Sequence, residues 1–361
     1  MSSLTNLAKC KEPCHFAFIG SAGIPNRYGG FEAFLEHCAP VLAAQGHSVT
    51  VTCDRSLYND REASYRGVVR LFIGIRANGI ASIIHDLCAF FRVYRYTTHI
   101  VVLGVSGGPW FPLWRLMCTF SGKRLIVNID GVEWRRSKFT TWHRCALRFF
   151  DAFAQIFSHV VVYDNVALLD FVLPYCRSKA VQIGYPGDHV LRFSDLQRDS
   201  NTALTICRIE PENQINLLIE GALLSKLNMY TVVGNWNASE YGRKLRNRYS
   251  AHPRLNLLDP IYDSKALAQL REQCGLYLHG HSVGGTNPSL VEMLFYDCVI
   301  LCFDCSFNRE TAGHAASYFS DANELARLIE VTDTTPDGRA ELRKRYTATN
   351  IASEYVDAAI T

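Results

Sequence analysis

Residues 15–53 read HFAFIGSAGIPNRYGGFEAFLEHCAPVLAAQGHSVTVTC, and this stretch indicates the fold class. The apolar run His15–Gly20 predicts a buried strand, and a long glycine-rich loop follows it. From Phe31 to Gln45 the apolar residues recur on one face at helical spacing, which predicts a helix. Gly46 ends that helix, and His47–Cys53 predicts a second strand. A strand, a helix and a strand in this order form the unit of a parallel sheet.

The same alternation continues along the chain, pauses in the turn-rich residues 182–203 and then restarts. The sequence therefore predicts an α/β protein with two Rossmann-like, doubly wound parallel-sheet domains facing a cleft. Further strands are predicted at 69–75, 99–104, 123–129 and 159–163, and then at 203–208, 229–235, 254–259, 275–280 and 298–303.

This pattern also predicts the domain boundaries. Residues 1–184 form an N-terminal domain, and 185–203 form a linker. Residues 204–340 form a C-terminal domain. Residues 341–361 form a C-terminal helix that packs back towards the N-terminal domain.

Composition excludes several classes of protein. The 361 residues are 48% hydrophobic and 20% charged, which rules out wholesale disorder. The 13 cysteines lie mostly in apolar runs, and no apolar leader precedes them, so we expect reduced thiols in a cytosol. Cys302 and Cys305 form a single C-x-x-C, which favours a buried strand end over a zinc or redox site.

The net charge of +3 conceals an asymmetry. Residues 1–180 contain 20 Lys and Arg against 12 Asp and Glu, whereas the remainder contains 17 against 22. The first domain is therefore basic and the second acidic. Aromatic residues accompany basic ones in 135–150 and in 106–120, which includes Trp110, Phe111 and Trp114. These segments predict an interfacial membrane surface; the alternative is an amphipathic core helix with a solvated basic face.

Two loops in the first half carry candidate functional residues. GSAGIPNRYGGFE (Gly20–Glu32) is long for an ordinary turn, and its glycines together with Arg27 favour a ligand-binding loop before a helix. NIDGVEWRR (128–136) follows a strand and offers Asp130 and Glu133, and Asp164 follows the next strand in the same way. Such an acid can orient or deprotonate an acceptor hydroxyl; the alternative is a satisfied turn residue.

Two loops in the second half are candidates for binding a diphosphate. In CRIEPENQIN (207–216), Arg208 at a strand end suits a diphosphate, although a surface salt bridge is the alternative. In HGHSVGGTNPSLVEML (279–294), the glycines can bind phosphate and Glu292 can accept ribose hydroxyls. Thr286 or Asn287 caps the helix that follows, and a plain capped helix is the alternative.

Together these stretches resemble family 4 glycosyltransferases of GT-B fold. More narrowly, the chain is similar to a bacterial rhamnosyltransferase-like branch that opens with G-x-x-G-I-P-x-x-Y-G-G-F-E. The resemblance also covers DGVEWRR, CRIEPEN, VVGNWNASEYG, DPIYD, HGHSVGGTNPSLVE and FNRET. Asp130, Glu133 and Asp164 are the candidate catalytic acids from their positions at strand ends. The resemblance implies that the domain 1–184 binds the acceptor, that the domain 204–340 binds the nucleotide sugar, and that a second set of residues binds the sugar donor. That set comprises Arg27, Gly29, Gly30, Arg208, Asn213, Gly284, Gly285, Thr286, Asn287 and Glu292.

Two positions depart from the wider family. Its E-x7-E motif has a Glu where Gly284 stands here, and its Lys about five residues after the Arg is replaced by Asn213. Besides Arg27, the residues that can supply compensating charge are His279, His281 and Arg309.

The resemblance implies a retaining transfer of L-rhamnose from dTDP-L-rhamnose to a polyprenyl-diphosphate-linked saccharide during surface polysaccharide synthesis. It implies no metal and no other cofactor. We expect the protein in the cytoplasm, bound peripherally to the anionic inner face of the cytoplasmic membrane, without a nucleic acid partner. Two alternatives remain: a non-catalytic assembly partner that binds a nucleotide sugar, and a dinucleotide-dependent oxidoreductase, which would lack the G-x-G-x-x-G fingerprint.

Overall fold

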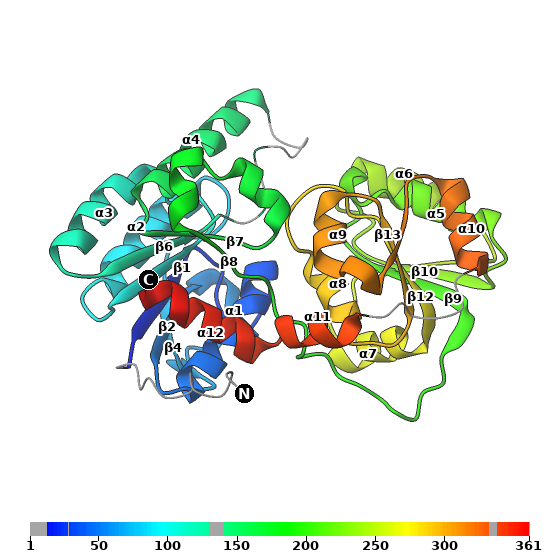
Figure 1. Ribbon diagram of the computed structural model, residues 1–361, viewed down its shortest axis with the longest axis horizontal. Coiled ribbons are helices and arrows are strands. Elements are labelled where there is room, and N and C mark those ends of the chain that lie inside the picture. Colours follow the sequence, from blue (N-terminus) through cyan, green and yellow to red (C-terminus); the bar gives the residue numbers. More distant parts are fainter. Residues whose placement is uncertain are drawn as a thin grey trace, which may run out of the picture. The chain divides into compact units, whose positions relative to one another are not determined.

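The computed structural model describes residues 13–27, 29–129, 131, 134, 140–331 and 338–360, which form two α/β units (Figure 1). Unit 1 contains the described residues up to Ile129, Ala146–Val162 and the chain from Ala352. Unit 2 contains the described residues between 130 and 145, and Tyr163–Ile351. Within the described ranges, no helix has the length and apolarity needed to cross a bilayer.

The first sheet confirms the six strands that the sequence predicts in this half. Its order is β3-β4-β2-β1-β5-β6-β7-β8. The predicted strands are β1 (His15–Ile19), β2 (Ser48–Asp54), β4 (Val68–Ile73), β5 (His99–Leu103), β6 (Arg124–Asn128) and β7 (Val160–Tyr163), and the short β8 is Ala180–Gln182.

The six predicted strands pair in parallel, as the sequence predicts, and one strand that the sequence did not predict makes the sheet mixed. The extra strand β3 (Ser64–Tyr65) pairs antiparallel with β4. Arg66 and Gly67 join the two with φ values of 48° and 82°. Positive φ at both central residues is typical of a tight hairpin turn, so this short strand folds back on its neighbour.

Helices α2 (Ala81–Val93) and α3 (Phe111–Phe120) of unit 1 pack against each other, and α4 (Thr141–Phe157) belongs to this unit from Ala146 onward (Figure 1). Phe90 of α2 stacks on Trp114 of α3 with ring centroids 4.7 Å apart. Phe111 and Trp114 are fully buried, so these two aromatic residues belong to the core and not to the surface that the sequence suggested.

The end of the chain completes the core of unit 1. The last helix, α12, spans Ala348–Ile360, and its residues from Ala352 belong to this unit. The ring of Tyr355 lies 5.9 Å from that of Phe18 and 5.2 Å from that of Phe34, the latter on α1 (Gly30–Ala44). Asn128 Nδ2 donates a hydrogen bond to the Tyr355 hydroxyl at 2.9 Å.

We expect Tyr355→Phe to lower the free energy of unfolding by about 1 kcal/mol, because a buried hydrogen bond is lost while the ring packing remains. Urea denaturation measures this change. Tyr262→Phe is the control, because Tyr262 is 91% exposed. Equal stability of Tyr355→Phe and wild type would contradict the anchoring role of this bond.

The second sheet is parallel throughout and has the order β11-β10-β9-β12-β13-β14. It confirms the five strands that the sequence predicts here and adds the short β14. The strands are β9 (Asp199–Ile206), β10 (Met229–Val233), β11 (Leu255–Leu258), β12 (Cys274–His279), β13 (Val299–Phe303) and β14 (Ser317–Phe319).

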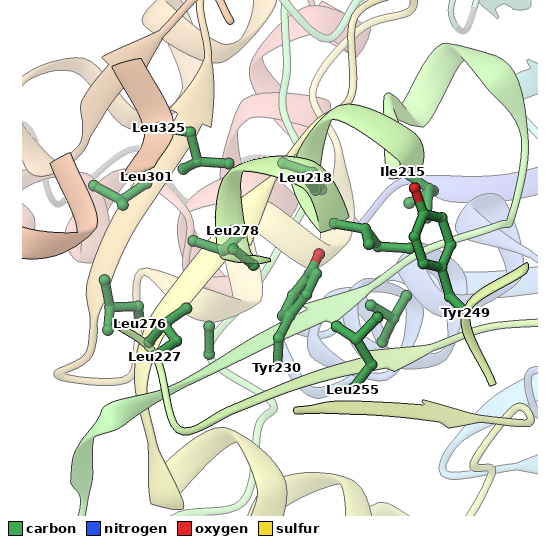
Figure 2. Close-up of a cluster of buried hydrophobic side chains, with 14 of the residues drawn as sticks. Ile215, Leu218, Leu227, Tyr230, Tyr249, Leu255, Leu276, Leu278, Leu301 and Leu325 are labelled. Atoms are coloured by element: carbon green, nitrogen blue, oxygen red, sulfur yellow. The ribbon is translucent and has the colours of Figure 1, made fainter. Parts of the chain in front are cut away.

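The helices of unit 2 bury apolar side chains against this sheet. Figure 2 shows Tyr230 and Leu278 of the sheet together with Leu218 and Ile215 of α5, all almost fully buried. The helices are α5 (Ile215–Leu224), α6 (Glu240–Tyr249), α7 (Ser264–Gln273), α8 (Pro288–Met293), α9 (Ser306–Ala312), α10 (Ala322–Val331) and α11 (Arg339–Arg345).

The segment 185–198, expected to be part of a linker, is bonded to unit 2. Arg192 forms ion pairs with Glu272 and with Asp297, the latter at 3.0 Å. The Tyr296 hydroxyl donates to the carbonyl of Leu191 at 2.8 Å. These partners are distant in sequence, so the polar composition that suggested a linker instead marks a segment attached by ion pairs.

The order of the second sheet contains a switch point. The chain runs from β9 to β10 and β11 in one direction and then places β12 on the other side of β9. The loops that follow β9 and β12 therefore leave the same edge in opposite directions. Ligands of doubly wound sheets bind at this position, beyond the carboxyl ends of the strands.

Candidate functional site

Two loops meet at the switch point of unit 2: the β9 loop (residues 207–214) and the β12 loop (residues 280–287). Asn213 Oδ1 lies 2.8 Å from His281 Nδ1. The backbone N–H and the hydroxyl of Ser282 both donate to the carbonyl of Glu212, at 2.9 and 2.8 Å. These bonds hold together two segments that are about seventy positions apart and that the sequence predicted separately.

Glycine is required where these loops approach each other. A Cβ atom on Gly280 would lie 2.2 Å from the backbone oxygen of Asn213, and Gly284 has a φ of +134°. A side chain at position 280 would therefore force the two loops apart, and one at position 284 would strain the backbone of the β12 loop. The glycines of this motif therefore determine how closely the two loops pack.

Asp164 holds the β12 loop through two hydrogen bonds with Thr286. Its carboxylate Oδ1 accepts a hydrogen bond from the Thr286 N–H at 2.9 Å, and its carbonyl accepts one from the Thr286 hydroxyl at 2.7 Å. Asp164 is only 2% exposed. A Cβ atom on Gly285 would lie 1.9 Å from the same Oδ1. Asp164 was predicted as a catalytic acid, and the structure places it as a buried partner of Thr286.

Asn287 caps α8, as the sequence predicted. Its side-chain oxygen accepts a hydrogen bond from the Ser289 N–H at 3.0 Å, and Pro288 occupies the first helical position. Thr286, the alternative cap in the sequence analysis, is instead bound to Asp164.

Glu292 in α8 is held by two basic side chains that the sequence did not suggest. Its carboxylate forms an ion pair with Arg271 of α7, and its Oε1 lies 3.2 Å from His189 Nε2. The exposed fraction of its side chain is 14%. Neither partner is near Glu292 in sequence or lies in a recognisable motif, so no local signal could have identified them.

The two arginines considered for the donor site differ in whether a carboxylate already binds their guanidinium group. Arg208 is exposed and forms no ion pair with any residue that the structure describes. The guanidinium of Arg309 is bound at both ends by the carboxylate of Asp304, at 2.5 and 2.7 Å. Arg208 is therefore better placed than Arg309 to neutralise a bound anion.

His279 cannot supply the compensating charge that the sequence suggested. It is 2% exposed, and burial, followed by the neighbouring His281, lowers the pKa of its imidazole to about 3. The ring is therefore neutral at physiological pH. Its Nε2 has no hydrogen-bond partner within the described part of the chain.

In unit 1, the loop after β1 is held by a buried acid. Glu32 Oε1 accepts a hydrogen bond from the Ala22 N–H at 2.6 Å. Gly29 precedes α1 and Gly30 is its first residue, while the exposed Arg27 lies over the ring of Tyr58 at 5.6 Å. The loop therefore has the support and the exposed cation that a ligand-binding segment needs.

The predicted acids Asp130 and Glu133 lie outside the described residues. The residue after Asp130 is described: a Cβ atom on Gly131 would lie 3.3 Å from both Gly284 Cα and Gly285 N. Gly131 itself therefore lies against the β12 loop within unit 2. In the described ranges, no group of three His, Cys, Asp or Glu side chains could hold a metal ion.

Comparisons with known proteins agree with this architecture. A family model described as a domain of unknown function (DUF1972) matches residues 14–188. No curated protein matches the sequence. Among solved structures, sucrose-phosphate synthase from Thermosynechococcus elongatus superposes with a TM-score of 0.76 at 14% identity, covering 95% of this chain and 98% of that one.

Two further structures are similar over the full length. HepE of Anabaena, solved with UDP, has a TM-score of 0.70 at 12% identity, over 95% of this chain and 98% of that chain. The catalytic domain of starch synthase IV from Arabidopsis thaliana, bound to ADP and acarbose, has a TM-score of 0.70 at 10% identity, over 96% of this chain and 99% of that chain. With its two parallel-sheet α/β domains, the chain therefore has the GT-B fold.

Proposed function

We propose that this protein is a glycosyltransferase that uses a nucleotide-diphosphate sugar as donor. The observation that carries the proposal is the pair of bonded loops at the switch point: the β9 loop, which carries the exposed Arg208, is bonded to the glycine-containing β12 loop. The solved structures with UDP, UDP-glucose and ADP share the fold and support the proposal. In unit 2, Arg208 and the β12 loop are the donor-binding residues of this proposal, and Arg27, Gly29 and Gly30 of unit 1 remain donor-binding predictions from the sequence.

The chemistry needs positive charge on the leaving group. Breaking the bond between sugar and diphosphate transfers negative charge to the diphosphate, and preorganised donors of hydrogen bonds stabilise that charge. Arg208 supplies a guanidinium, and the β12 loop supplies backbone N–H groups. In this proposal Asp130 orients the acceptor hydroxyl, Glu292 binds the ribose, the reaction retains the anomeric configuration, and no metal takes part.

Thermal unfolding with a ligand panel tests the donor class. We expect dTDP-L-rhamnose, UDP-glucose or another nucleotide sugar to raise the melting temperature, because a ligand that binds only the folded state stabilises it. Stabilisation by NAD(H) alone would contradict the proposal and favour the oxidoreductase. The resemblance to the rhamnosyltransferase-like branch supports dTDP-L-rhamnose as the first donor to test.

We also propose that the acceptor is a lipid-linked saccharide at the anionic inner face of the cytoplasmic membrane. The support comes from exposed apolar side chains on α2, α3 and α4. Of the 18 large hydrophobic side chains that are exposed among the described residues, ten lie between residues 80 and 156. On α3, Leu113, Leu116 and Phe120 follow helical spacing, so they form one outward face.

Charge on these helices is complementary to an anionic surface. Between residues 80 and 128 the chain carries five Arg or Lys and one acidic residue, Asp86. Asp86 is 1% exposed and hydrogen-bonded to Ser106, so it does not offset the basic residues at the surface. Apolar residues with surrounding basic groups are typical of helices that lie in a membrane interface.

We expect the double variant Leu116→Glu, Phe120→Glu to bind vesicles of phosphatidylglycerol and phosphatidylethanolamine roughly ten-fold more weakly than wild type, because two apolar side chains leave the interface. Vesicle flotation measures the binding. The control is Leu224→Glu, which changes a side chain of similar exposure in unit 2. Equal loss in both variants, or no loss in either, would contradict the docking face.

A further inference from the structure

Two loops at the carboxyl edge of the first sheet are bonded to one buried carboxylate. Asp54 is the last residue of β2 and is 2% exposed. Its Oδ1 accepts hydrogen bonds from the N–H and the hydroxyl of Ser56 at 2.9 and 2.7 Å, and its Oδ2 accepts one from the N–H of Ala77 at 2.9 Å. Ser56 follows β2 and Ala77 follows β4, so this carboxylate holds the loops after both strands together.

The same hydrogen bonds keep the carboxylate ionised at neutral pH. Burial alone would raise the pKa of Asp54, but the bonds from Ser56 and Ala77 lower it below its usual value. The charge of Asp54 is therefore balanced by donors inside the two loops, and it is shielded from a ligand at the surface.

Each loop carries an exposed arginine directly before the residue that bonds to Asp54. Arg55 precedes Ser56, and Arg76 precedes Ala77. Since one carboxylate binds both of these neighbours, the two arginines leave the backbone close to each other. Neither arginine forms an ion pair with a residue in the ranges that the structure covers.

The surface around these two arginines is free of competing acids along the chain. Residues 55–59 and 74–80 contain no Asp or Glu. The next acid, Asp60, is already paired with Arg70 at 2.5 Å. The two loops therefore offer two guanidinium groups to an anion at the carboxyl edge of the sheet.

Exposed apolar side chains follow one of these arginines. Ile80 is 78% exposed and Ile84 is 46% exposed. Ile80 directly precedes α2, and Ile84 lies one turn further on the same face. A short apolar surface thus begins four residues after Arg76.

We infer that Arg55 and Arg76 bind the diphosphate of the lipid-linked acceptor, and that Ile80 and Ile84 contact the first part of its prenyl chain. The inference rests on the proposed function, because it names the part of unit 1 that holds the acceptor. Two guanidinium groups match the charge of a diphosphate, and each can donate a pair of hydrogen bonds to its oxygens. Ligands of doubly wound sheets bind beyond the carboxyl ends of the strands, where these loops lie.

Calorimetric titration of farnesyl diphosphate tests the site, with UDP in excess so that the donor site is occupied. We expect the double variant Arg55→Gln, Arg76→Gln to raise the Kd about ten-fold, because charge-assisted hydrogen bonds at an exposed site are lost. The matched control is Arg92→Gln, Arg95→Gln, which removes two exposed arginines at the other end of α2. The inference would be overturned by an equal loss in the control, by an unchanged Kd in the first variant, or by a wild type that does not bind farnesyl diphosphate.

Isopentenyl diphosphate separates the diphosphate contact from the prenyl contact, because it carries the same diphosphate on a much shorter chain. Loss of the two arginines is expected to weaken binding of both ligands. The double variant Ile80→Ser, Ile84→Ser is expected to weaken binding of farnesyl diphosphate about five-fold and to leave isopentenyl diphosphate unchanged, since apolar contact is lost only along the longer chain. Equal loss for both ligands in this variant would overturn the prenyl contact.

Titration of UDP-glucose distinguishes this inference from the proposed function. We expect Arg55→Gln, Arg76→Gln to bind UDP-glucose as wild type does. An equal loss for UDP-glucose and farnesyl diphosphate would assign the two arginines to the donor site and overturn the inference. If wild type bound no nucleotide sugar, the proposed function would fail, while the titration of farnesyl diphosphate would still decide whether this edge of unit 1 binds a diphosphate.

Discussion

Gly285→Ala is expected to lower the free energy of unfolding by about 3 kcal/mol, which adds the cost of crowding to the loss of a buried hydrogen bond. The added methyl group would lie 1.9 Å from Asp164 Oδ1 and 2.5 Å from its carboxyl carbon. Asp164 is buried and cannot move away without releasing the Thr286 N–H. The substitution therefore disturbs the support of the whole β12 loop.

Urea denaturation measures the loss for Gly285→Ala, and binding of UDP-glucose is expected to weaken in the same variant. Gly74→Ala is the matched control, because no atom lies within 4 Å of the added Cβ and Gly74 is not among the glycines with positive φ. We expect its stability to equal or slightly exceed that of wild type. A loss below 1 kcal/mol for Gly285→Ala would show that Asp164 does not support the loop as described.

Arg208→Ala is expected to weaken binding of a nucleotide-diphosphate sugar roughly thirty-fold, which corresponds to about 2 kcal/mol for a charge-assisted hydrogen bond to phosphate. Folding should change little, because the side chain is exposed and forms no ion pair with a described residue. Calorimetric titration of UDP and UDP-glucose measures the effect. Both ligands should lose affinity equally, because both carry the diphosphate.

The control for Arg208→Ala is Arg248→Ala. Arg248 is an exposed arginine of α6 in the same unit, and its guanidinium lies over the ring of Tyr249 at 5.0 Å. Equal loss of affinity in the two variants would indicate a general effect of positive charge on unit 2. Unchanged affinity in Arg208→Ala would remove this residue from the site.

Local sequence patterns predict most of this fold. Eleven strands follow from short apolar runs between turn signals, and the structure confirms each of them. The short β3, β8 and β14 were missed, because strands of two or three residues leave no periodic signal. Phe111 and Trp114 were assigned to the surface, because a single helix does not show which of its faces a neighbouring helix will cover.

The candidate site was predictable in part. The motifs at 207–216 and 279–294 identified the two loops, because each begins at the end of a predicted strand and contains the glycine or proline that is typical of a loop before a helix. Their mutual bonds depend on the order of the strands in the sheet, which the motifs do not encode. Arg271 and His189, the partners of Glu292, come from segments with no motif, so only the folded structure reveals them.

The most direct test of the central claim is incubation of the protein with nucleotide sugars and polyprenyl-diphosphate-linked saccharides, followed by mass spectrometry of the lipid fraction. The account predicts that one acceptor gains the mass of one sugar residue while an equal amount of nucleoside diphosphate is released. Folded protein that binds a nucleotide sugar but adds no sugar to any acceptor would contradict the proposed transfer and favour a non-catalytic binding partner.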